Sequence, residues 1–379
     1  MSLSKPERPM ECGHGDNMVK ALLFTSAFGD GHRQVACALR YAFVKRGVET
    51  IEVDCFRSTS PYIAGLLEST YDWLTRHGSH IYGMMYNRTA HFGSKSKLWK
   101  FASRVSKSAA IAAIEEHRPD IVLQVFPDHA IASLPQRLHK PYIGVVLTDY
   151  SIHGHWFHEN VNTYFLPHER FVARAQPFVP RHSELVVTGI PIRPQFYTRT
   201  EHLVTQRQHP YIVFATGGRG VFPHITYTVE AACDMLPDYD VYVMCGRSIS
   251  MYQEIKEIAL RIPRVQALPY VEDVDAWFRG AEFAVIKAGG ITVSECLATR
   301  CPMVLYRPQP GQEADNAAFL EHEGAGKVVR NLKEFKETVT QLRCSQRQRV
   351  MSQTCERIAR SDAAERVVQH VLRNVGYMN

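Results

Sequence analysis

Two short stretches of this sequence carry residue types that could do chemistry. The first is TSAFGDGHRQVA, where two glycines and an aspartate precede His32. An apolar run, VKALLF, leads into it and a helical pattern follows, so we expect a strand, a tight turn and a helix with His32 in its first turn. A histidine titrates near neutral pH, and it can serve as a general base where it lies beside a cleft.

The second stretch is KAGGITVSECLA, which YRPQPGQEADN follows. A strand ending in Gly289 and Gly290 lets backbone N–H groups approach an anion, and the positive end of the next helix adds about 0.3 to 1 kcal/mol for a negative charge. This pattern predicts a phosphate site. An alternative needs no ligand, because Thr292 and Glu295 have the T-x-x-E spacing of a capping box. The residues alone leave both interpretations open.

Parallel βα units would position both stretches. Short β-branched runs alternate with longer helical patterns, which is typical of parallel sheets covered by helices. The predicted strands are VKALLFTSA, ETIEVDCF, DIVLQVF, YIGVVLTDY, TYFLPHE and ELVVTG in the first half, and YIVFATGG, DVYVMCG, FAVIKAGG and PMVLYRP in the second. The sequence therefore predicts an α/β protein with two Rossmann-like doubly wound domains, whose ligands bind at the carboxyl ends of the strands.

Composition shifts along the chain indicate domain boundaries. We expect a flexible tail at 1–18, a first domain at 19–194, a linker rich in proline and polar residues at 195–210, and a second domain at 211–355. A C-terminal helix at 356–379 could pack back on the first domain.

The overall composition is that of a globular protein, with 45% hydrophobic and 22% charged residues among 379. No apolar run approaches the roughly 20 residues of a bilayer span, and the N-terminus lacks the apolar core of a signal peptide, so we expect a cytosolic chain. A net charge of +6 is too weak to indicate a nucleic-acid partner. Nine cysteines without a C-x-x-C pair indicate neither a disulfide framework nor a structural zinc site.

Several segments together resemble a known family. FGDGHRQVA, FPDHA, TDYSIHGHWFHENVNTY, VTGIPIRPQF, LPYVEDVDAWF, KAGGITVSECLA and RPQPGQEADN are similar, in kind and order, to landmarks of the processive diacylglycerol glucosyltransferases and plant monogalactosyldiacylglycerol synthases. The resemblance runs from Val19 to about Val371. It implies a GT-B fold with two domains facing across a cleft, a UDP-sugar co-substrate, a diacylglycerol acceptor and inversion at the anomeric carbon. It implies no tightly bound cofactor and no metal.

The resemblance assigns the donor site to the second domain. The assigned residues are Gly289, Gly290 and Thr292 for the pyrophosphate, Glu295 for the ribose, Gln312, Glu313 and Asn316 for the hexose, and the backbone of Tyr270 and Val271 for uracil. The TGGRG turn, with Gly218, Arg219 and Gly220, would face the phosphates from the other side. The family carries a small residue and a histidine where this chain has Gly218 and Arg219. Arg219 could therefore bind phosphate or be a solvated loop charge.

The resemblance assigns the acceptor to the first domain. An alcohol is too weak an acid to attack unaided, so His32, beside Gly31, would be its general base, and Asp149 could orient that base. The histidines of TDYSIHGHWFHEN have a spacing that invites a metal site, but no cysteine or second carboxylate completes one. We expect this loop, with His155 and Trp156, to shape the acceptor pocket instead.

The segment 61–107 interleaves aromatic and basic residues and is long for a βα connection. Trp73 and Tyr82 are among its aromatics, and one helical face would carry Lys97, Lys100, Arg104 and Lys107. Such a face could simply be solvated, and similar mixtures occur in single-stranded nucleic-acid grooves. With a lipid acceptor implied, we favour docking on an anionic membrane surface and no nucleic-acid partner.

The resulting hypothesis is an enzyme that moves glucose from UDP-glucose to diacylglycerol, and could also extend its product, as a peripheral protein at the cytoplasmic face of the cell membrane. A UDP-galactose-dependent monogalactosyldiacylglycerol synthase is the alternative within the family. A UDP-sugar epimerase and a UDP-sugar-sensing regulatory protein are alternatives of other classes.

Overall fold

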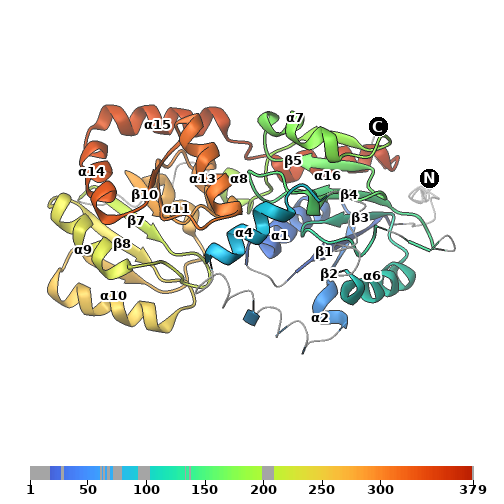
Figure 1. The fold of residues 1–379 in the computed structure, drawn as a ribbon, viewed down its shortest axis with the longest axis horizontal. Coiled ribbons are helices and arrows are strands. Elements are labelled where there is room, and N and C mark those ends of the chain that lie inside the picture. Colours follow the sequence, from blue (N-terminus) through green and yellow to red (C-terminus); the bar gives the residue numbers. More distant parts are fainter. Residues whose placement is uncertain are drawn as a thin grey trace, which may run out of the picture.

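Two parallel sheets organise the chain (Figure 1). The structure is a computed structural model that describes residues 18–26, 30–59, 62, 65, 69–70, 79–92, 103–132, 134–135, 138–198 and 209–377. Each sheet has six strands among these residues, and helices cover both faces of each sheet. The predicted pair of doubly wound domains is confirmed.

The first sheet has the strand order β2-β1-β3-β4-β5-β6, with every neighbouring pair parallel. Its strands are β1 (Lys20–Thr25), β2 (Glu49–Asp54), β3 (Ile121–Gln124), β4 (Tyr142–Val146), β5 (Thr163–Leu166) and β6 (Glu184–Val187). Every residue of β3 and β5 is buried, as expected for strands covered on both faces. The chain winds one way from β1 to β2 and the other way from β3 onward. The segments that follow β1 and β3 therefore meet at a topological switch point, the usual place for a ligand.

The second sheet has the order β12-β11-β10-β7-β8-β9 and is also parallel. Its strands are β7 (Tyr211–Ala215), β8 (Asp240–Met244), β9 (Val265–Leu268), β10 (Phe283–Ile286), β11 (Met303–Tyr306) and β12 (Gly326–Val329). The switch point lies between β7 and β10, so TGGRG and KAGGIT meet there. The predicted strands omitted β9 and β12, which lie at the two edges of this sheet.

The helices of the first domain include α1 (Asp30–Val44), α2 (Cys55–Thr59), α4 (Ser79–Thr89), α6 (Arg104–His117) and α7 (Val172–Ala175), with short 3-10 turns η1 (Gly154–Trp156), η2 (Glu169–Phe171) and η3 (Gln176–Phe178). The short α8 (Gln195–Thr198) follows β6 toward the second domain. The second sheet is covered by α9 (Ile225–Met235), α10 (Ile249–Arg261), α11 (Val274–Gly280), α12 (Gly290–Ala298), α13 (Gln312–Glu323), α14 (Leu332–Leu342) and α15 (Ser345–Ile358).

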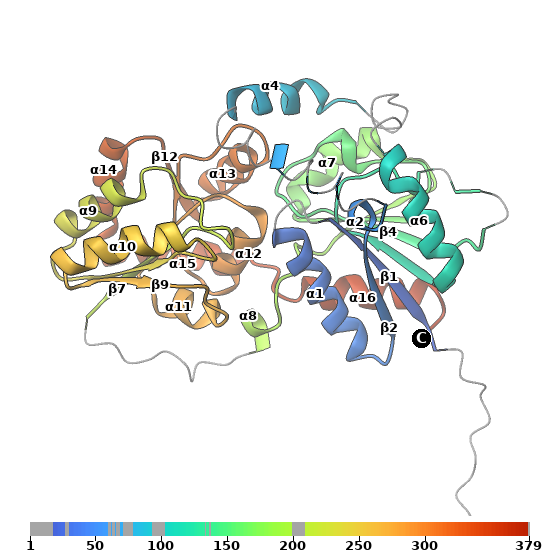
Figure 2. The ribbon, with the colours of Figure 1, turned by 90° about the horizontal axis from the view of Figure 1, so that it is seen from below.

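The last helix, α16 (Ala363–Asn374), returns to the first domain (Figures 1 and 2). It packs against α1 and β4, and its Glu365 forms an ion pair with Arg46 after α1. Arg360, just before α16, pairs with Glu169 of the first domain at 3.0 Å. The chain thus crosses between the domains twice, which ties them together. The exact domain bounds stay a prediction.

The aromatic and basic segment is described only in part. Trp73, Lys97 and Lys100 lie outside the described residues, as does the 1–17 part of the expected tail. Helix α6 begins at Arg104, which is exposed, and Lys107 is half-buried. Among the residues that the structure describes, no helix has the length and apolar character needed to cross a membrane.

Candidate active site

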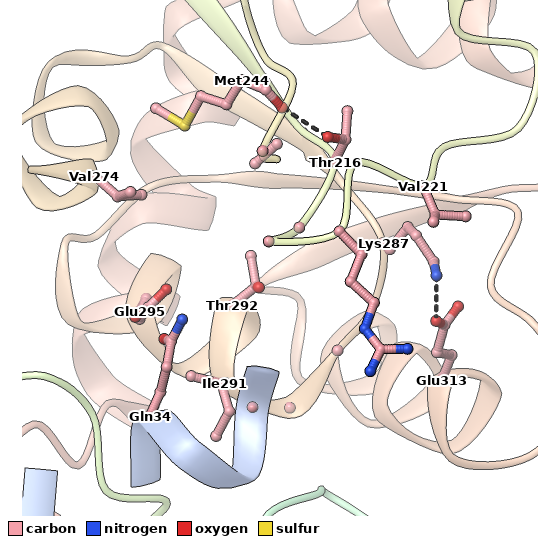
Figure 3. A pocket seen from close by; sticks show the side chains of 18 of the residues that line it. Gln34, Thr216, Val221, Met244, Val274, Lys287, Ile291, Thr292, Glu295 and Glu313 are labelled. Carbon is pink, nitrogen blue, oxygen red and sulfur yellow. Dashed lines mark hydrogen bonds and ion pairs between the residues drawn. The ribbon is translucent and has the colours of Figure 1, made fainter. Parts of the chain in front are cut away.

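A cavity of about 350 Å³ lies between the two domains. Segments following strands of both sheets line it, because the carboxyl ends of the two sheets face each other. It brings together most of the predicted site residues, namely Gly31, His32, Asp149, Gly218, Arg219, Tyr270, Val271, Gly289, Gly290, Thr292, Glu295, Gln312 and Glu313. Figure 3 shows side chains from both domains around this cavity, with Gln34 of α1 near Glu295 of α12.

The N-terminus of α12 forms one wall. The helix begins at Gly290 with Gly289 as its N-cap, and no side chain bonds to the cap. Thr292 therefore lies inside the helix and faces the cavity, and the capping-box interpretation is wrong. Asp149 of the first domain accepts from the Gly290 N–H, so the N–H groups that follow it, together with the positive end of the helix, are the ones available to an anion.

Glu295 has a different partner from the one a capping box would give it. Its Oε1 accepts from Arg193 Nε at 3.0 Å and from Arg193 Nη2 at 2.9 Å. Burial raises the pKa of the Glu295 carboxyl, and the Arg193 guanidinium opposes this shift. Because Arg193 occupies Oε1, Oε2 is the oxygen left to accept from a ligand hydroxyl. Sequence reasoning assigned no role to Arg193, although it lies in the IPIRPQF stretch that carried part of the resemblance.

The first turn of α13 supplies two further polar side chains, Gln312 and Glu313. Lys287 Nζ pairs with Glu313 Oε1 at 3.0 Å (Figure 3), and the backbone N–H of Gln309 donates to Glu313 Oε2 at 3.1 Å. Lys287 was also given no role, although it directly precedes the AGG stretch. Gln312 lines the cavity and accepts a bond from Tyr82 Oη at 2.9 Å. Tyr82 thus contacts the second domain. The role predicted for Tyr82 from the sequence was in acceptor or membrane binding.

Asn316 does not line the cavity, in contrast to its predicted contact with the hexose. Its side chain is fully buried and bonds to both domains. Nδ2 donates to Asp149 Oδ1 at 2.9 Å and to the Ala288 carbonyl at 2.8 Å, while Oδ1 accepts from the Tyr150 N–H at 2.6 Å. Asn316 therefore joins the domains rather than contacting the cavity.

His32 lies in the first turn of α1, as predicted. Its Nδ1 is 2.8 Å from the carbonyl oxygen of Val125, which follows β3, and 3.4 Å from Thr148 Oγ1. A carbonyl only accepts, so Nδ1 carries the proton and Nε2 is the basic nitrogen. Burial lowers the pKa of His32 to about 4, and the bond to Val125 opposes that shift. The ring is therefore neutral and able to accept a proton at neutral pH.

Asp149 does not provide the expected orientation of the histidine through Nδ1, because Val125 takes that position. Asp149 instead accepts from Asn316 and from the backbone N–H of Gly290. Burial raises the pKa of its carboxyl. The neighbouring Tyr150 stacks on Phe319 of α13, with ring centroids 4.7 Å apart. This loop therefore fastens the first domain to the second, and a catalytic role for Asp149 stays a prediction.

Three other predicted residues lie away from the cavity lining. Trp156 is buried in the core of the first domain, and His155 lies beside His129 with ring centroids 5.5 Å apart, so neither shapes this cavity. Gly220 is buried at a positive φ of 64°, where a Cβ would come within 2.3 Å of the Cys245 carbonyl oxygen, so it shapes the turn. In the described part of the chain, no cluster of three or more histidine, cysteine or acidic residues could hold a metal ion.

The loop between β9 and α11 lines the cavity on the side that the resemblance assigned to uracil. Tyr270 and Val271 line it, and the Arg247 guanidinium lies over the Tyr270 ring, 4.3 Å from its centroid. Arg219 also lines the cavity, and the choice between a phosphate contact and a loop charge stays a prediction.

Comparison with known proteins places this geometry in a wider context. Residues 32–192 match the family model described as monogalactosyldiacylglycerol (MGDG) synthase. A processive diacylglycerol beta-glucosyltransferase of Bacillus cereus (strain AH187) is 28% identical over 366 residues, covering 93% of each chain. One of Bacillus mycoides (strain KBAB4) is 28% identical over 368 residues, again covering 93% of each chain.

Solved structures share the fold. MurG of Acinetobacter baumannii superposes with a TM-score of 0.62 at 14% identity, covering 94% of this chain and 99% of that chain. The glycotransferase of kitacinnamycin gives a TM-score of 0.65 at 13% identity, covering 95% and 100%. S. aureus MnaA, solved with UDP, gives 0.62 at 14% identity, covering 95% and 98%. The chain therefore has the GT-B fold, and its predicted resemblance to the diacylglycerol glycosyltransferases is confirmed.

Proposed function

We propose that this enzyme transfers glucose from UDP-glucose to the free hydroxyl of diacylglycerol, with inversion at the anomeric carbon. The observation that carries this proposal is that the His32 ring, whose tautomer is fixed by Val125, and the N-terminus of α12 line the same cavity. The first supplies a base for an alcohol, and the second supplies donors for a diphosphate.

The reaction would be a single displacement. Nε2 of His32 takes the proton of the acceptor hydroxyl as its oxygen bonds to the anomeric carbon. The bond from that carbon to the UDP oxygen breaks on the opposite face, and its electron pair leaves with UDP. The transition state resembles an oxocarbenium ion, and the backbone N–H groups at the start of α12 would meet the charge that grows on the diphosphate. Glu295 would accept from the ribose through Oε2.

Glucose is the proposed sugar because the relatives named glucosyltransferases match more of the chain than the MGDG synthase model does. The curated relatives that cover 93% of the chain are named glucosyltransferases. The MGDG synthase model matches residues 32–192, which end before the donor loops that follow β7, β10 and β11. Transfer from UDP-galactose is the alternative that the assay below separates.

An epimerase remains the main rival from another class. The fold is shared with a putative UDP-N-acetylglucosamine 2-epimerase from Listeria monocytogenes, with a TM-score of 0.60 at 13% identity. Fold likeness at this identity does not distinguish the two activities, so the lipid requirement must do so.

Access to a lipid acceptor would require binding to a membrane, and we propose its anionic cytoplasmic face. The outward surface of α4 supports this, because Ile81, Met84 and Met85 are 55%, 52% and 57% exposed. Arg88 on α4 and Arg104 on α6 are also exposed. Apolar side chains would insert at the interface, and each basic residue near an anionic surface contributes about 1 kcal/mol.

A transfer assay and a vesicle sedimentation experiment test these proposals. The protein is incubated with radiolabelled UDP-glucose or UDP-galactose, with and without diacylglycerol in anionic vesicles, and the lipid extract is examined. We expect label in the lipid with UDP-glucose and diacylglycerol present. Donor consumption without lipid would indicate an epimerase, and donor binding without turnover would indicate a sensor. Sedimentation with neutral vesicles in high salt that equalled sedimentation with anionic vesicles in low salt would contradict electrostatic docking.

A further inference from the structure

Helix α4, from the first half of the chain, lies against the loop between β11 and α13 of the second domain. Figures 1 and 2 show it at the boundary of the two domains, next to α13. A Cβ on Gly83 would lie 2.2 Å from Pro310 Cβ, so the α4 backbone touches this loop directly. A Cβ on Gly311, which has a φ of 102°, would lie 3.0 Å from Tyr82 Cε1. The contact therefore depends on glycine on both sides.

A hydrogen bond crosses this contact. Tyr82 Oη donates to Gln312 Oε1 at 2.9 Å. Gln312 lines the cavity and Tyr82 is not among the lining residues, so this bond links Tyr82 to a bound ligand through Gln312. With Oε1 engaged, the carboxamide turns its Nε2 donors elsewhere, and none of the described residues bonds to Nε2.

The neighbouring Glu313 complements this amide. Lys287 and the Gln309 N–H hold its two carboxylate oxygens, each of which retains a lone pair. Gln312 then presents its two Nε2 donors to a ligand, and Glu313 can only accept. A sugar hydroxyl can both donate and accept a hydrogen bond. A fixed amide beside a fixed carboxylate therefore favours a sugar whose hydroxyls lie where one can accept from Gln312 and one can donate to Glu313.

We infer that Tyr82 is a positioning residue for the donor sugar. It holds the Gln312 carboxamide so that Nε2 donates to a sugar hydroxyl, and the first domain thereby completes the hexose part of the donor site. This inference rests on the proposed function, because it takes the cavity to bind a UDP-hexose.

The test compares UDP with UDP-glucose, because only the second ligand carries the hexose. Calorimetry gives the Kd of both ligands for the wild type and Tyr82→Phe, which removes one hydroxyl. We expect Tyr82→Phe to weaken UDP-glucose by about 3- to 10-fold, the value of one neutral hydrogen bond, with UDP unchanged. In turnover, KM for the donor should rise while kcat holds.

Tyr86→Phe is the matched control. Tyr86 lies one turn further along α4, and its hydroxyl bonds to Ser151 Oγ of the first domain at 3.1 Å. It should leave the ratio of the two Kd values at the wild-type value. In a Gln312→Ala background, Tyr82→Phe should have no further effect, because the two residues act as a pair.

The inference is overturned if Tyr82→Phe keeps the wild-type ratio of the UDP-glucose Kd to the UDP Kd. It is overturned as well if Tyr86→Phe raises that ratio as much as Tyr82→Phe does. It is also overturned if Tyr82→Phe weakens UDP and UDP-glucose alike. A wild-type protein that binds neither ligand would instead overturn the proposed function, so the two failures are distinguishable.

Discussion

The starts of α1 and α12 are built alike and present opposite chemistry. Each helix follows a buried strand and has a glycine that lines the cavity in its first turn. The start of α1 presents a side chain, the His32 ring, whose tautomer is fixed by Val125. The start of α12 presents backbone N–H groups, the first of which donates to Asp149 of the other domain. One local pattern thus places the proposed base in the first domain and the proposed anion site in the second.

The glycines at the two starts also differ in what surrounds them. A Cβ on Gly31 would lie 3.3 Å from Ile291 Cγ1, and one on Gly290 would lie 2.1 Å from the Thr148 carbonyl oxygen. Nothing lies within 4 Å of a Cβ on Gly289. Gly31 and Gly290 thus allow the domains to approach, whereas Gly289 faces open space that a ligand could fill.

Removing the base should give the largest effect. We expect His32→Ala to lower kcat by about 10²- to 10⁴-fold, because a positioned general base contributes that much to a proton transfer. UDP affinity, measured by calorimetry on the same preparation, should not change. Near wild-type turnover would make His32 a structural residue. A collapse with Asp149→Asn but not with His32→Ala would transfer the role to the carboxylate.

Removing the Arg193 side chain should lower the stability of the folded protein. Arg193→Ala leaves the Glu295 carboxylate buried without its partner, so we expect a loss of about 3 to 5 kcal/mol in the free energy of unfolding. Urea denaturation measures this loss. Arg181→Ala, at an exposed arginine, is the control and should stay within about 0.5 kcal/mol of wild type. Equal stability of both variants would show that Glu295 is not held as described.

The two glycines at the start of α12 form a matched pair. Gly290→Ala places a methyl group against backbone, and we expect a loss of about 1 to 3 kcal/mol in thermal unfolding experiments. Gly289→Ala should leave stability nearly unchanged but weaken UDP binding, because its methyl group enters the space proposed for the diphosphate. Unaltered UDP affinity in Gly289→Ala would place the diphosphate elsewhere.

The smallest effect should be the pH dependence near neutrality. A pKa of about 4 keeps His32 neutral well above that pH, so kcat/KM should vary little between about pH 6 and pH 8. Activity should be lost as the pH falls toward about 4, because protonation removes the base. His32→Ala should lack this acidic limb. A limb near the ordinary histidine pKa of about 6.5 would mean that the ring is solvated in the free enzyme.

The sequence by itself determined the two α/β domains, ten of the strands and the position of His32 at a helix start. These features follow from hydrophobic period and from glycine turns, which are local along the chain. Since parallel strands share one carboxyl edge, the loop residues of the cavity followed as well. Strands β9 and β12 were missed because a polar residue, Gln266 in VQAL and Lys327 in GKVV, interrupts each short apolar run.

Only the tertiary structure decided which polar groups meet. Arg193 and Glu295 are 102 positions apart, Asp149 and Asn316 are 167 apart, and Tyr82 and Gln312 are 230 apart. The T-x-x-E pattern was consistent with a cap, yet the buried carboxylate of Glu295 binds a guanidinium from the segment between the domains. A buried polar group takes whichever partner domain packing brings within reach, since leaving it unpaired costs about 1 to 3 kcal/mol. No local pattern records that choice, because it is made when the two domains pack together.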